Sequence, residues 1–370
     1  MAAADQHGLP EQPQAELEVQ PCDTGERSEQ AALFRANFGV EGALAVLIWR
    51  YDRCPHGQSV TLIGKVGDKA VAGYACNPRR IGWQDGDVTI GQTGDVMTLA
   101  EARGKGFFSE LDRKAMGATV QAGWPVVFGL PNRQSAPLFL NKLGWSGVGR
   151  LKPWTLICQV DAVARAERMR AGRLASLWTG FAFRKGRRKL AALKELGRDF
   201  HAVPIHRFGD WVEGPVKQVA KNYPWMVRRD ADYLNWRFFD SPNAHFMAWR
   251  LDGPDGKAAG YVVVQAPLDG YGVGYLVDLV APDPRAHGAG IVCAVAGLHQ
   301  LGASVVRAHA IAGSDWQNQL IGAGFQPPKA QDEKRVIVFV HQSDHPLAQV
   351  AMDARRWFFT DADRDDELVR

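Results

Sequence analysis

The stretch that decides the fold is DVTIGQTGDVMTLAEARGKGFF, residues 87–108. Its first half alternates apolar and polar residues from Val88 to Thr98, which is the period of a half-buried β-strand. A turn, Arg103-Gly104-Lys105-Gly106, follows, and an amphipathic helix begins at Phe107. Free backbone N–H groups and the helix dipole converge at such a helix start, and glycines let an anion approach the backbone closely. The stretch therefore predicts a strand, an anion-binding turn and a helix.

The residues after this helix give the same order of strand and helix again. PVVFG (125–129) has the composition of a short buried strand, and LPNRQSAPLFLNKLGW (130–145) predicts a helix with Asn132 near its start. By itself the Arg-Gly-Lys-Gly turn is a weak signal, because such a turn is more often only a turn. The full order, ending in Leu-Gly-Trp, is more specific.

In this order and spacing the sequence resembles the GNAT superfamily of acyl-CoA N-acyltransferases. The matching residues are Arg103, Gly106 and Phe108 in the family's pyrophosphate motif (Arg/Gln-x-x-Gly-x-Gly/Ala), and Asn132, Ser135, Leu143, Gly144 and Trp145 in its following Asn-to-Gly-Phe segment. The resemblance covers residues 31–160. It implies an α/β fold in which a mixed, mostly antiparallel central sheet is flanked by helices.

The resemblance also implies acetyl-CoA, or a near relative, as the acyl donor, with no metal. Backbone amides of the turn would hold the pyrophosphate, and the end of the preceding strand would pair with the pantetheine arm as if with an added strand. That strand would diverge from the PVVFG strand, with the thioester in the gap. The implied cofactor-binding residues are Val96, Met97, Thr98, Arg103, Gly104, Lys105, Gly106, Phe107, Phe108, Asn132 and Ser135.

Two positions depart from the family pattern. Phe108 replaces a Gly or Ala, so its side chain must turn away from the ligand. Leu140 stands where the family often has a Tyr that protonates the leaving thiolate, so the general acid is unassigned. Because an attacking amine must be unprotonated, we expect a base. Asp95 is the best-placed carboxylate, ahead of Glu101, although a turn residue that caps local N–H groups is an equally good interpretation of Asp95.

An internal repeat organises the rest of the chain. LIWRYDRCPHG…DKAVAGY (47–74) aligns without gaps with LNWRFFDSPNA…DGKAAGY (234–261), with eight identities in 28 positions, where about two are expected by chance. We infer two tandem domains, each with a helix, a Pro-containing loop and two strands, of which the second ends at Gly-Tyr. The shared Trp-Arg-aromatic triplet, 49–51 in the first copy, is interpreted mainly as scaffold.

The second copy keeps the pattern but lacks the chemistry. His287-Gly288-Ala289-Gly290 stands where the pyrophosphate motif is expected, without the leading Arg, and Asn132 has no counterpart. We infer a degenerate GNAT-like domain that packs on the first and helps to wall the acceptor site. Asp278 lies at a point similar to Asp95, which slightly favours a structural role for both.

The predicted organisation has four segments: a disordered tail at 1–30, an acyl-CoA-binding GNAT domain at 31–160, a basic helical connector at 161–198, and a second, degenerate GNAT-like domain at 199–370. The connector carries eleven Lys and Arg. A solvated helix is favoured there over a strip that binds phosphate or nucleic acid. The C-terminal TDADRDDE (360–367) is interpreted as a solvated acidic end.

Composition excludes several classes of protein. The 370 residues are 46% apolar and 23% charged, which is typical of a globular protein. No run of about 18 apolar residues could span a membrane. A net charge of +4 is too mild to indicate nucleic acid, and the five scattered cysteines fit neither a disulfide framework nor a zinc site. We expect a cytoplasmic protein with no membrane partner and no nucleic-acid partner; the oligomeric state is open.

The function predicted is N-acyl transfer, with the acetyl group of acetyl-CoA moving to an amine of a small molecule or amino sugar by direct attack on the thioester. Two alternatives stay open. One is a Fem-type aminoacyl transferase that uses charged tRNA, held by the basic connector. The other is a non-catalytic acyl-CoA-binding module, suggested by the missing Tyr. Whether an amine or a hydroxyl is acylated, and the acyl chain length, are not decided by the sequence.

Overall fold

A computed structural model describes residues 16–39, 43–83, 86–242, 245–268, 272–327 and 333–365, except for the side chains of Trp83, 161–162 and 164–177. The main strands are β1 (Glu18–Pro21), β2 (Val60–Val66), β3 (Lys69–Trp83), β4 (Gly86–Thr98), β5 (Val126–Gly129), β6 (Ser146–Ile157), β7 (His201–Ile205), β9 (Phe246–Asp252), β10 (Ala258–Gln265), β11 (Val273–Val280), β12 (Val305–Ile311) and β13 (Lys334–Val340). The helices are α1 (Arg27–Phe38), α2 (Ala43–Leu47), α3 (Phe107–Gln121), α4 (Ala136–Lys142), α5 (Val160–Leu196), α6 (Glu213–Ala220), α7 (Ala231–Phe238), α8 (Pro284–Gln300), α9 (Asp315–Ala323) and α10 (Pro346–Ala351).

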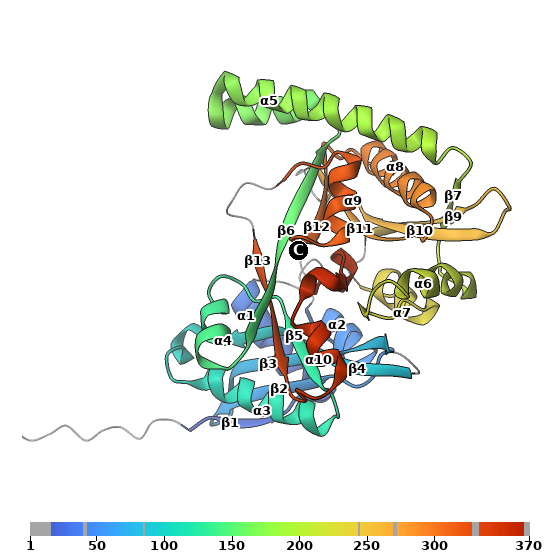
Figure 1. Ribbon diagram of the computed structural model, residues 1–370. Coiled ribbons are helices and arrows are strands. Elements are labelled where there is room, and N and C mark those ends of the chain that lie inside the picture. The colour runs from blue at the N-terminus through green and yellow to red at the C-terminus, as the bar shows by residue number, and fades with distance from the viewer. Residues whose placement is uncertain are drawn as a thin grey trace, which may run out of the picture.

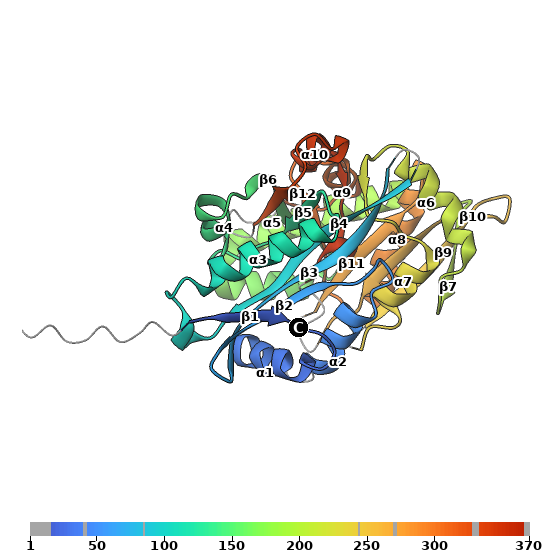
Figure 2. The ribbon, with the colours of Figure 1, turned by 90° about the horizontal axis from the view of Figure 1, so that it is seen from below.

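The long strands form one sheet, in the order β1-β2-β3-β4-β5-β13-β6-β12-β11-β10-β9-β7. Neighbouring strands are antiparallel except for the pairs β4–β5 and β11–β12, which are parallel. Helices cover both faces, with α1 and α2 on the opposite side from α3 (Figures 1 and 2). The predicted fold class, two similar α/β units with mixed and mostly antiparallel strands, is confirmed.

The two halves exchange their last strands. β13, which comes from the end of the chain, lies between β5 and β6 and pairs antiparallel with both. β6, which ends the first half, pairs antiparallel with β12 of the second half along seven residues. In Figure 1 β13 and β6 run side by side from one half into the other. The predicted segments 31–160 and 199–370 therefore share one sheet, and each supplies a strand next to the other's parallel pair.

The predicted tail at 1–30 is wrong for residues 16–30. β1 pairs antiparallel with β2, and α1 begins at Arg27 rather than at Ala31. Leu17 is 6% exposed, and Arg27 is buried and paired with Asp52 at 2.7 Å. The partners β2 and Asp52 are distant in the sequence from residues 16–30. This short, mostly polar segment therefore shows no hydrophobic periodicity that would predict a strand or a helix. Residues 1–15 lie outside the described part.

The prediction that the second strand of each copy ends at Gly-Tyr is also wrong. Gly73 and Tyr74 lie within β3, which continues to Trp83, and Gly260 and Tyr261 lie near the start of β10. Both tyrosines are fully buried, because each side chain packs beneath helices and donates its hydroxyl to a buried carboxylate. Both tyrosines are therefore buried residues within their strands and do not mark a strand end.

The repeated tryptophans join the two copies. Trp49, from the π-helical turn η1 (Ile48–Asp52), stacks on Trp236 of α7, with ring centroids 4.7 Å apart and planes at 18°. Trp49 Nε1 donates to the Trp236 carbonyl at 2.8 Å, and Trp236 Nε1 donates to the Trp49 carbonyl at 3.0 Å. This reciprocal pair gives the copies an approximate two-fold relation and supports the scaffold interpretation of the triplet.

Helix α5 is the longest element and runs along one edge of the molecule (Figure 1). No single helix within the described residues is long and apolar enough to cross a membrane. The pair Arg27–Phe38 and Ala43–Asp52 reaches that length and composition only when counted together, across a bend of 114°.

A buried carboxyl group lies in the core between α3 and the sheet. Asp112 of α3 is 2% exposed. Its Oδ1 accepts hydrogen bonds from the Tyr74 hydroxyl at 2.7 Å and from Trp145 Nε1 at 3.2 Å. Burial raises the pKa of Asp112 to about 6, and the two donors oppose the shift. The folded protein therefore binds the proton of Asp112 more tightly than the unfolded chain does.

This raised pKa predicts a pH-dependent stability. The contribution of Asp112 is fully present below the unfolded pKa and is lost as the pH rises through the folded value. Relative to an Asp112→Asn variant, the wild type should lose about 1.4 kcal/mol of unfolding free energy between about pH 5 and about pH 8. Urea unfolding of both proteins at the two pH values measures this difference. Asp255→Asn, which removes an exposed carboxyl group, controls for net charge. An equal change in unfolding free energy between the two pH values for all three proteins would contradict the prediction.

Candidate active site

The parallel strands β4 and β5 form a fork. They pair only at Gly91–Thr93 with Val127–Gly129, whereas β4 continues to Thr98. From Gly94 onward β4 keeps β3 on one side and has no strand on the other among the described residues. A cavity of about 310 Å³ lies in this opening. It is lined by Phe34, Phe38, Thr93, Gly94, Asp95, Val96, Leu130, Pro131, Asn132, Ser135, Phe139, Lys334 and Asp365.

Asp95 lies at a bulge in β4 where the fork opens. Its φ is 48°, in the left-handed region, and the β3–β4 register shifts at this point. Its Oδ2 accepts hydrogen bonds from Arg50 Nη1, at 2.5 Å, and from the Tyr51 hydroxyl. Burial and the Asp95 charge raise the pKa of Tyr51 well above its usual value, so this hydroxyl stays a donor. The predicted carboxylate is thus on the cavity wall, in a fixed orientation.

The glycine turn has the conformation expected of an anion site. Gly104 and Gly106 have φ of 81° and 83°, which other residues adopt at a cost. Gly106 directly precedes α3, so the amides of Phe107 and Phe108 have no acceptor within the helix. A Cβ on either glycine would meet nothing within 4 Å. The turn therefore presents open backbone donors.

The neighbours of this turn fit the same use. Arg103 Nε donates to the Thr98 carbonyl at 3.2 Å, which ties the turn to the end of β4. The Phe108 ring packs edge-on against the Phe139 ring, with ring centroids 5.2 Å apart. The Met97 side chain is 2% exposed and belongs to the core cluster that includes Leu33 and Phe34.

The turn before α4 closes the other side of the fork; the helix predicted over 130–145 spans only Ala136–Lys142. Asn132 Oδ1 accepts hydrogen bonds from the Gln134 and Ser135 amides, both at 2.9 Å. This leaves the Asn132 amide nitrogen for a ligand. Asn132, Ser135 and Val96 line one cavity, whereas Met97, Thr98 and residues 103–108 are not among its lining residues. Glu101 does not join them, because its carboxylate pairs with Lys69 on the surface at 2.8 Å.

The C-terminal segment, which the sequence did not place at the site, forms part of the cavity wall. TDADRDDE was interpreted as a solvated end, but Thr360, Asp361, Asp363 and Arg364 are each at most 5% exposed. Asp365 lines the fork. A Cβ at Gly94 would lie 2.2 Å from Asp365 Oδ2, so glycine is needed there for the segment to pass.

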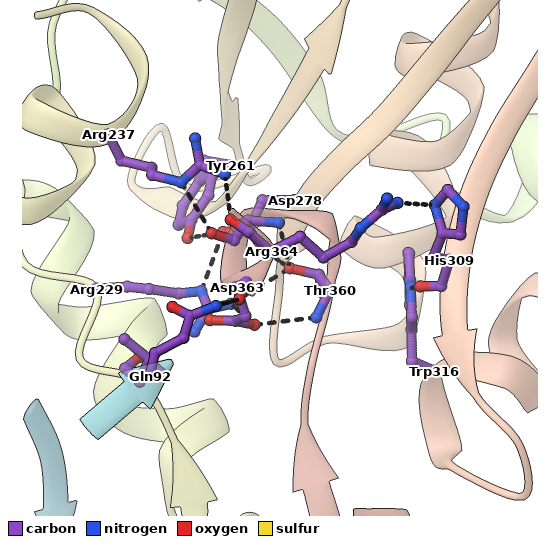
Figure 3. A network of polar contacts seen from close by, with 12 residues as sticks. Gln92, Arg229, Arg237, Tyr261, Asp278, His309, Trp316, Thr360, Asp363 and Arg364 are labelled. Carbon is purple, nitrogen blue, oxygen red and sulfur yellow. Dashed lines mark hydrogen bonds and ion pairs between the residues drawn. The ribbon is translucent and has the colours of Figure 1, made fainter. Parts of the chain in front are cut away.

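The two repeated arginines hold this segment. Arg50 Nη2 donates to the Asp365 carbonyl at 3.0 Å. Arg237 donates to the carbonyls of Ala362 and Arg364, both at 2.9 Å. Gln92 of β4 donates to the Asp363 carbonyl at 2.9 Å. Figure 3 shows the segment between Arg237 and Gln92 on one side and His309 on the other. The repeated Trp-Arg pair was the sequence signal that could have located it.

The second half has a corresponding fork that its own chain fills. β11 and β12 pair only at Val273–Tyr275 with Val305–Arg307. The Thr360 hydroxyl donates to Asp278 Oδ1 of β11, and the His309 amide of β12 donates to Asp361 Oδ2, both at 2.8 Å. Asp278 is fully buried and also binds Arg229 at 3.0 Å. Its role is structural.

The glycines of the second copy do not form an anion-binding turn. His287 to Gly290 lie inside α8, which begins at Pro284. A Cβ on Gly288 would meet Leu193 at 3.1 Å, and one on Gly290 would meet Leu279 at 2.5 Å. These glycines serve close packing, which agrees with a degenerate second half.

A search of the described residues finds no group of three or more His, Cys, Asp or Glu side chains that could hold a metal ion. The site residues are consistent instead with a ligand held by backbone donors and an open strand edge.

Comparisons with known proteins agree with this geometry. Residues 18–148 match the family model of the acetyltransferase (GNAT) domain. A search of curated protein sequences finds no match.

Similar solved structures cover about nine tenths of the chain. A GCN5-related N-acetyltransferase from Kribbella flavida has a TM-score of 0.60 at 14% identity, over 89% of this chain and 72% of that one. Saccharomyces cerevisiae N-myristoyltransferase with bound myristoyl-CoA has a TM-score of 0.57 at 13% identity, over 90% and 85%. A tandem GNAT protein from the clavulanic acid biosynthesis pathway has a TM-score of 0.55 at 13% identity, over 88% and 98%. Residues 18–148 thus match a GNAT acetyltransferase domain, and most of the chain is similar in fold to a tandem GNAT protein.

Proposed function

We propose that this chain is an N-acyltransferase that moves the acetyl group of acetyl-CoA to an amine of a small molecule or amino sugar. One observation carries the proposal: the first fork holds a cavity lined by Asp95, Val96 and Asn132, whereas the second fork is filled by Thr360–Asp363. The open fork lies in the half that matches the GNAT acetyltransferase domain, and we take it as the ligand site.

The residues present fit a CoA thioester. The pyrophosphate would lie at the turn 103–108, where the helix dipole and the N–H groups at the start of α3 favour an anion, although the Arg103 amide already donates to the Ala100 carbonyl at 3.3 Å. The pantetheine arm would lie along the open edge of β4, at 96–98, where Val96 lines the cavity together with Asn132 and Ser135. The donor supplies an activated acyl carbon, and these residues orient it.

Asp95 is the proposed base. It lines the cavity, and Arg50 and Tyr51 fix its orientation. The amine nitrogen attacks the thioester carbon, the C–S bond breaks, and the proton of the amine goes to Asp95 directly or through one water. Because Leu140 replaces the family's frequent Tyr, the thiolate takes its proton from solvent.

The acetyl group is the proposed acyl group because residues 18–148 match an acetyltransferase domain. The yeast neighbour has myristoyl-CoA bound, so other acyl donors occur on this fold. A cytoplasmic location is part of the proposal, because none of the five cysteines is in a disulfide.

The two alternatives make different predictions. A non-catalytic binding module would bind CoA without turnover. A Fem-type aminoacyl transferase would release no CoA with any amine and would bind tRNA with strong salt dependence.

Blocking the turn should abolish cofactor binding. In Gly106→Trp a large side chain occupies the space in front of the turn amides, so the affinity for acetyl-CoA in calorimetry should fall at least about tenfold. Gly123→Trp is the matched control. Gly123 has a φ of 77°, also has nothing within 4 Å of its Cβ, and lies at the opposite end of α3. Equal affinities for both variants and the wild type would remove the turn from the cofactor site.

Removing the proposed base should reduce turnover and leave binding intact. Asp95→Asn keeps an oxygen acceptor for Arg50 and Tyr51 but cannot take a proton, so kcat should fall about 100-fold or more with KM for acetyl-CoA unchanged. The measurement is release of free CoA across a panel of amines. Asp87→Asn, at the other end of the same strand, should keep wild-type turnover. If Asp95→Asn also does, Asp95 has no part in the chemistry.

A further inference from the structure

The outward side of α5 has no structural role in the described part of the protein. This surface, called here the outer face of α5, comprises Trp178, Phe181, Arg184, Lys185 and Arg188. It lies on the long helix at the edge of the molecule (Figure 1), and neither fork includes any of its residues.

The opposite side of the helix is anchored. A Cβ on Gly186 would lie 3.2 Å from Leu156, and one on Gly197 would lie 2.8 Å from the Arg285 carbonyl. Leu190 and Leu193 pack against the core of the second half. At about 3.6 residues per turn, these positions share one stripe, and positions 178, 181, 184, 185 and 188 project from the other side.

The outer face exposes large aromatic side chains. Trp178 is 73% exposed and Phe181 is 55% exposed. Their rings pack edge to face, with centroids 6.3 Å apart. Leu196, 51% exposed, follows Trp178 by about five full turns and so lies on the same line. Exposed aromatic groups in a row are unusual on a soluble surface and indicate a partner with an apolar layer.

The same face carries uncompensated positive charge. Arg184, Lys185 and Arg188 are exposed, and none forms an ion pair with an acidic side chain in the described part of the chain. Arg187, at the flank, stacks on the Phe183 ring at 5.8 Å. The acidic Glu195 near the end of the helix is paired with Arg198 at 2.9 Å. The partner must therefore bring negative charge as well as apolar surface.

We propose that the outer face of α5 docks on the surface of a bilayer that contains anionic lipid. Trp and Phe enter the headgroup boundary, and the Arg and Lys side chains bind lipid phosphates, as in interfacial amphipathic helices. A second copy of this chain fits poorly, because two such faces repel each other. A single-stranded nucleic acid prefers a basic groove with stacking platforms, whereas this face is convex. A flat, anionic and apolar surface matches all three properties.

The expectation of no membrane partner came from the lack of a spanning segment. A helix that lies in the membrane–water interface needs no spanning segment. The lack of such a segment therefore does not exclude membrane binding by α5. The proposal is also independent of the acyltransferase site.

The test is co-sedimentation of the full chain with phosphatidylcholine vesicles that contain or lack phosphatidylglycerol. We expect binding only to the anionic vesicles, weakened by added salt. Trp178→Ser with Phe181→Ser should weaken binding on the order of tenfold, and Arg184→Gln with Arg188→Gln should do so to a similar extent. Acetyl-CoA binding should be unchanged in both double variants, which also shows that they are folded.

Matched controls separate this face from general effects. Met352→Ser removes another exposed apolar side chain, and Lys217→Gln with Lys257→Gln removes two exposed charges elsewhere. Both should bind vesicles like the wild type. No binding of the wild type to anionic vesicles would overturn the proposal, as would equal losses in the controls. Binding to tRNA that the α5 variants lose, without vesicle binding, would assign the face to nucleic acid instead.

Discussion

The exchange of β6 and β13 is the constraint on which the rest of the molecule depends. β13 pairs with β5 along four residues and β6 pairs with β12 along seven, so each half completes the hydrogen bonding of the other's parallel pair. Unpaired strand edges are costly, and neither half could satisfy these edges alone. The exchange also determines where the chain must end. Because β13 lies in the middle of the sheet, the residues that follow it emerge between the two forks. The reciprocal Trp49 and Trp236 hydrogen bonds fix the halves about the same axis.

The C-terminal segment explains why the second fork is filled and the first fork keeps a cavity. Arg229 is fully buried and would be unstable alone; Asp278 and Asp363 pair with it at 3.0 and 2.7 Å. These bonds draw Thr360–Asp363 into the second fork, where a ligand could enter only by displacing a buried ionic network. The segment reaches the first fork only at Asp365, against Gly94, and a cavity is left beside it. The C-terminal segment thus fills the second fork with Thr360–Asp363 and forms part of the wall of the first with Asp365.

Local patterns in the sequence predicted the parts of the site that are local in structure. The alternation of β4, the two left-handed glycines and the Asn132 turn each need only neighbouring residues, and the repeat was visible because tryptophan is rare. The sequence could not predict that β1 is ordered, because its partner β2 is about forty residues away. The burial of Thr360–Arg364 depends on Arg229, Arg237 and His309, whose proximity follows from the strand exchange. An acidic stretch without its partners is indistinguishable from a solvated end.

Because the exchanged strands β6 and β13 join the two halves, α5 is not needed to hold them together. A connector of 37 residues is far longer than two halves joined by adjacent strands require. Its described contacts are with α8 and α9 of the second half and with β6, the strand that pairs with β12. Had the connector been the link between the halves, its apolar residues would be expected in the interface. Instead Trp178 and Phe181 face outward among unpaired cations. An exposed Trp adds nothing to the stability of this fold, so the composition of that face is better explained by what it contacts than by what it supports.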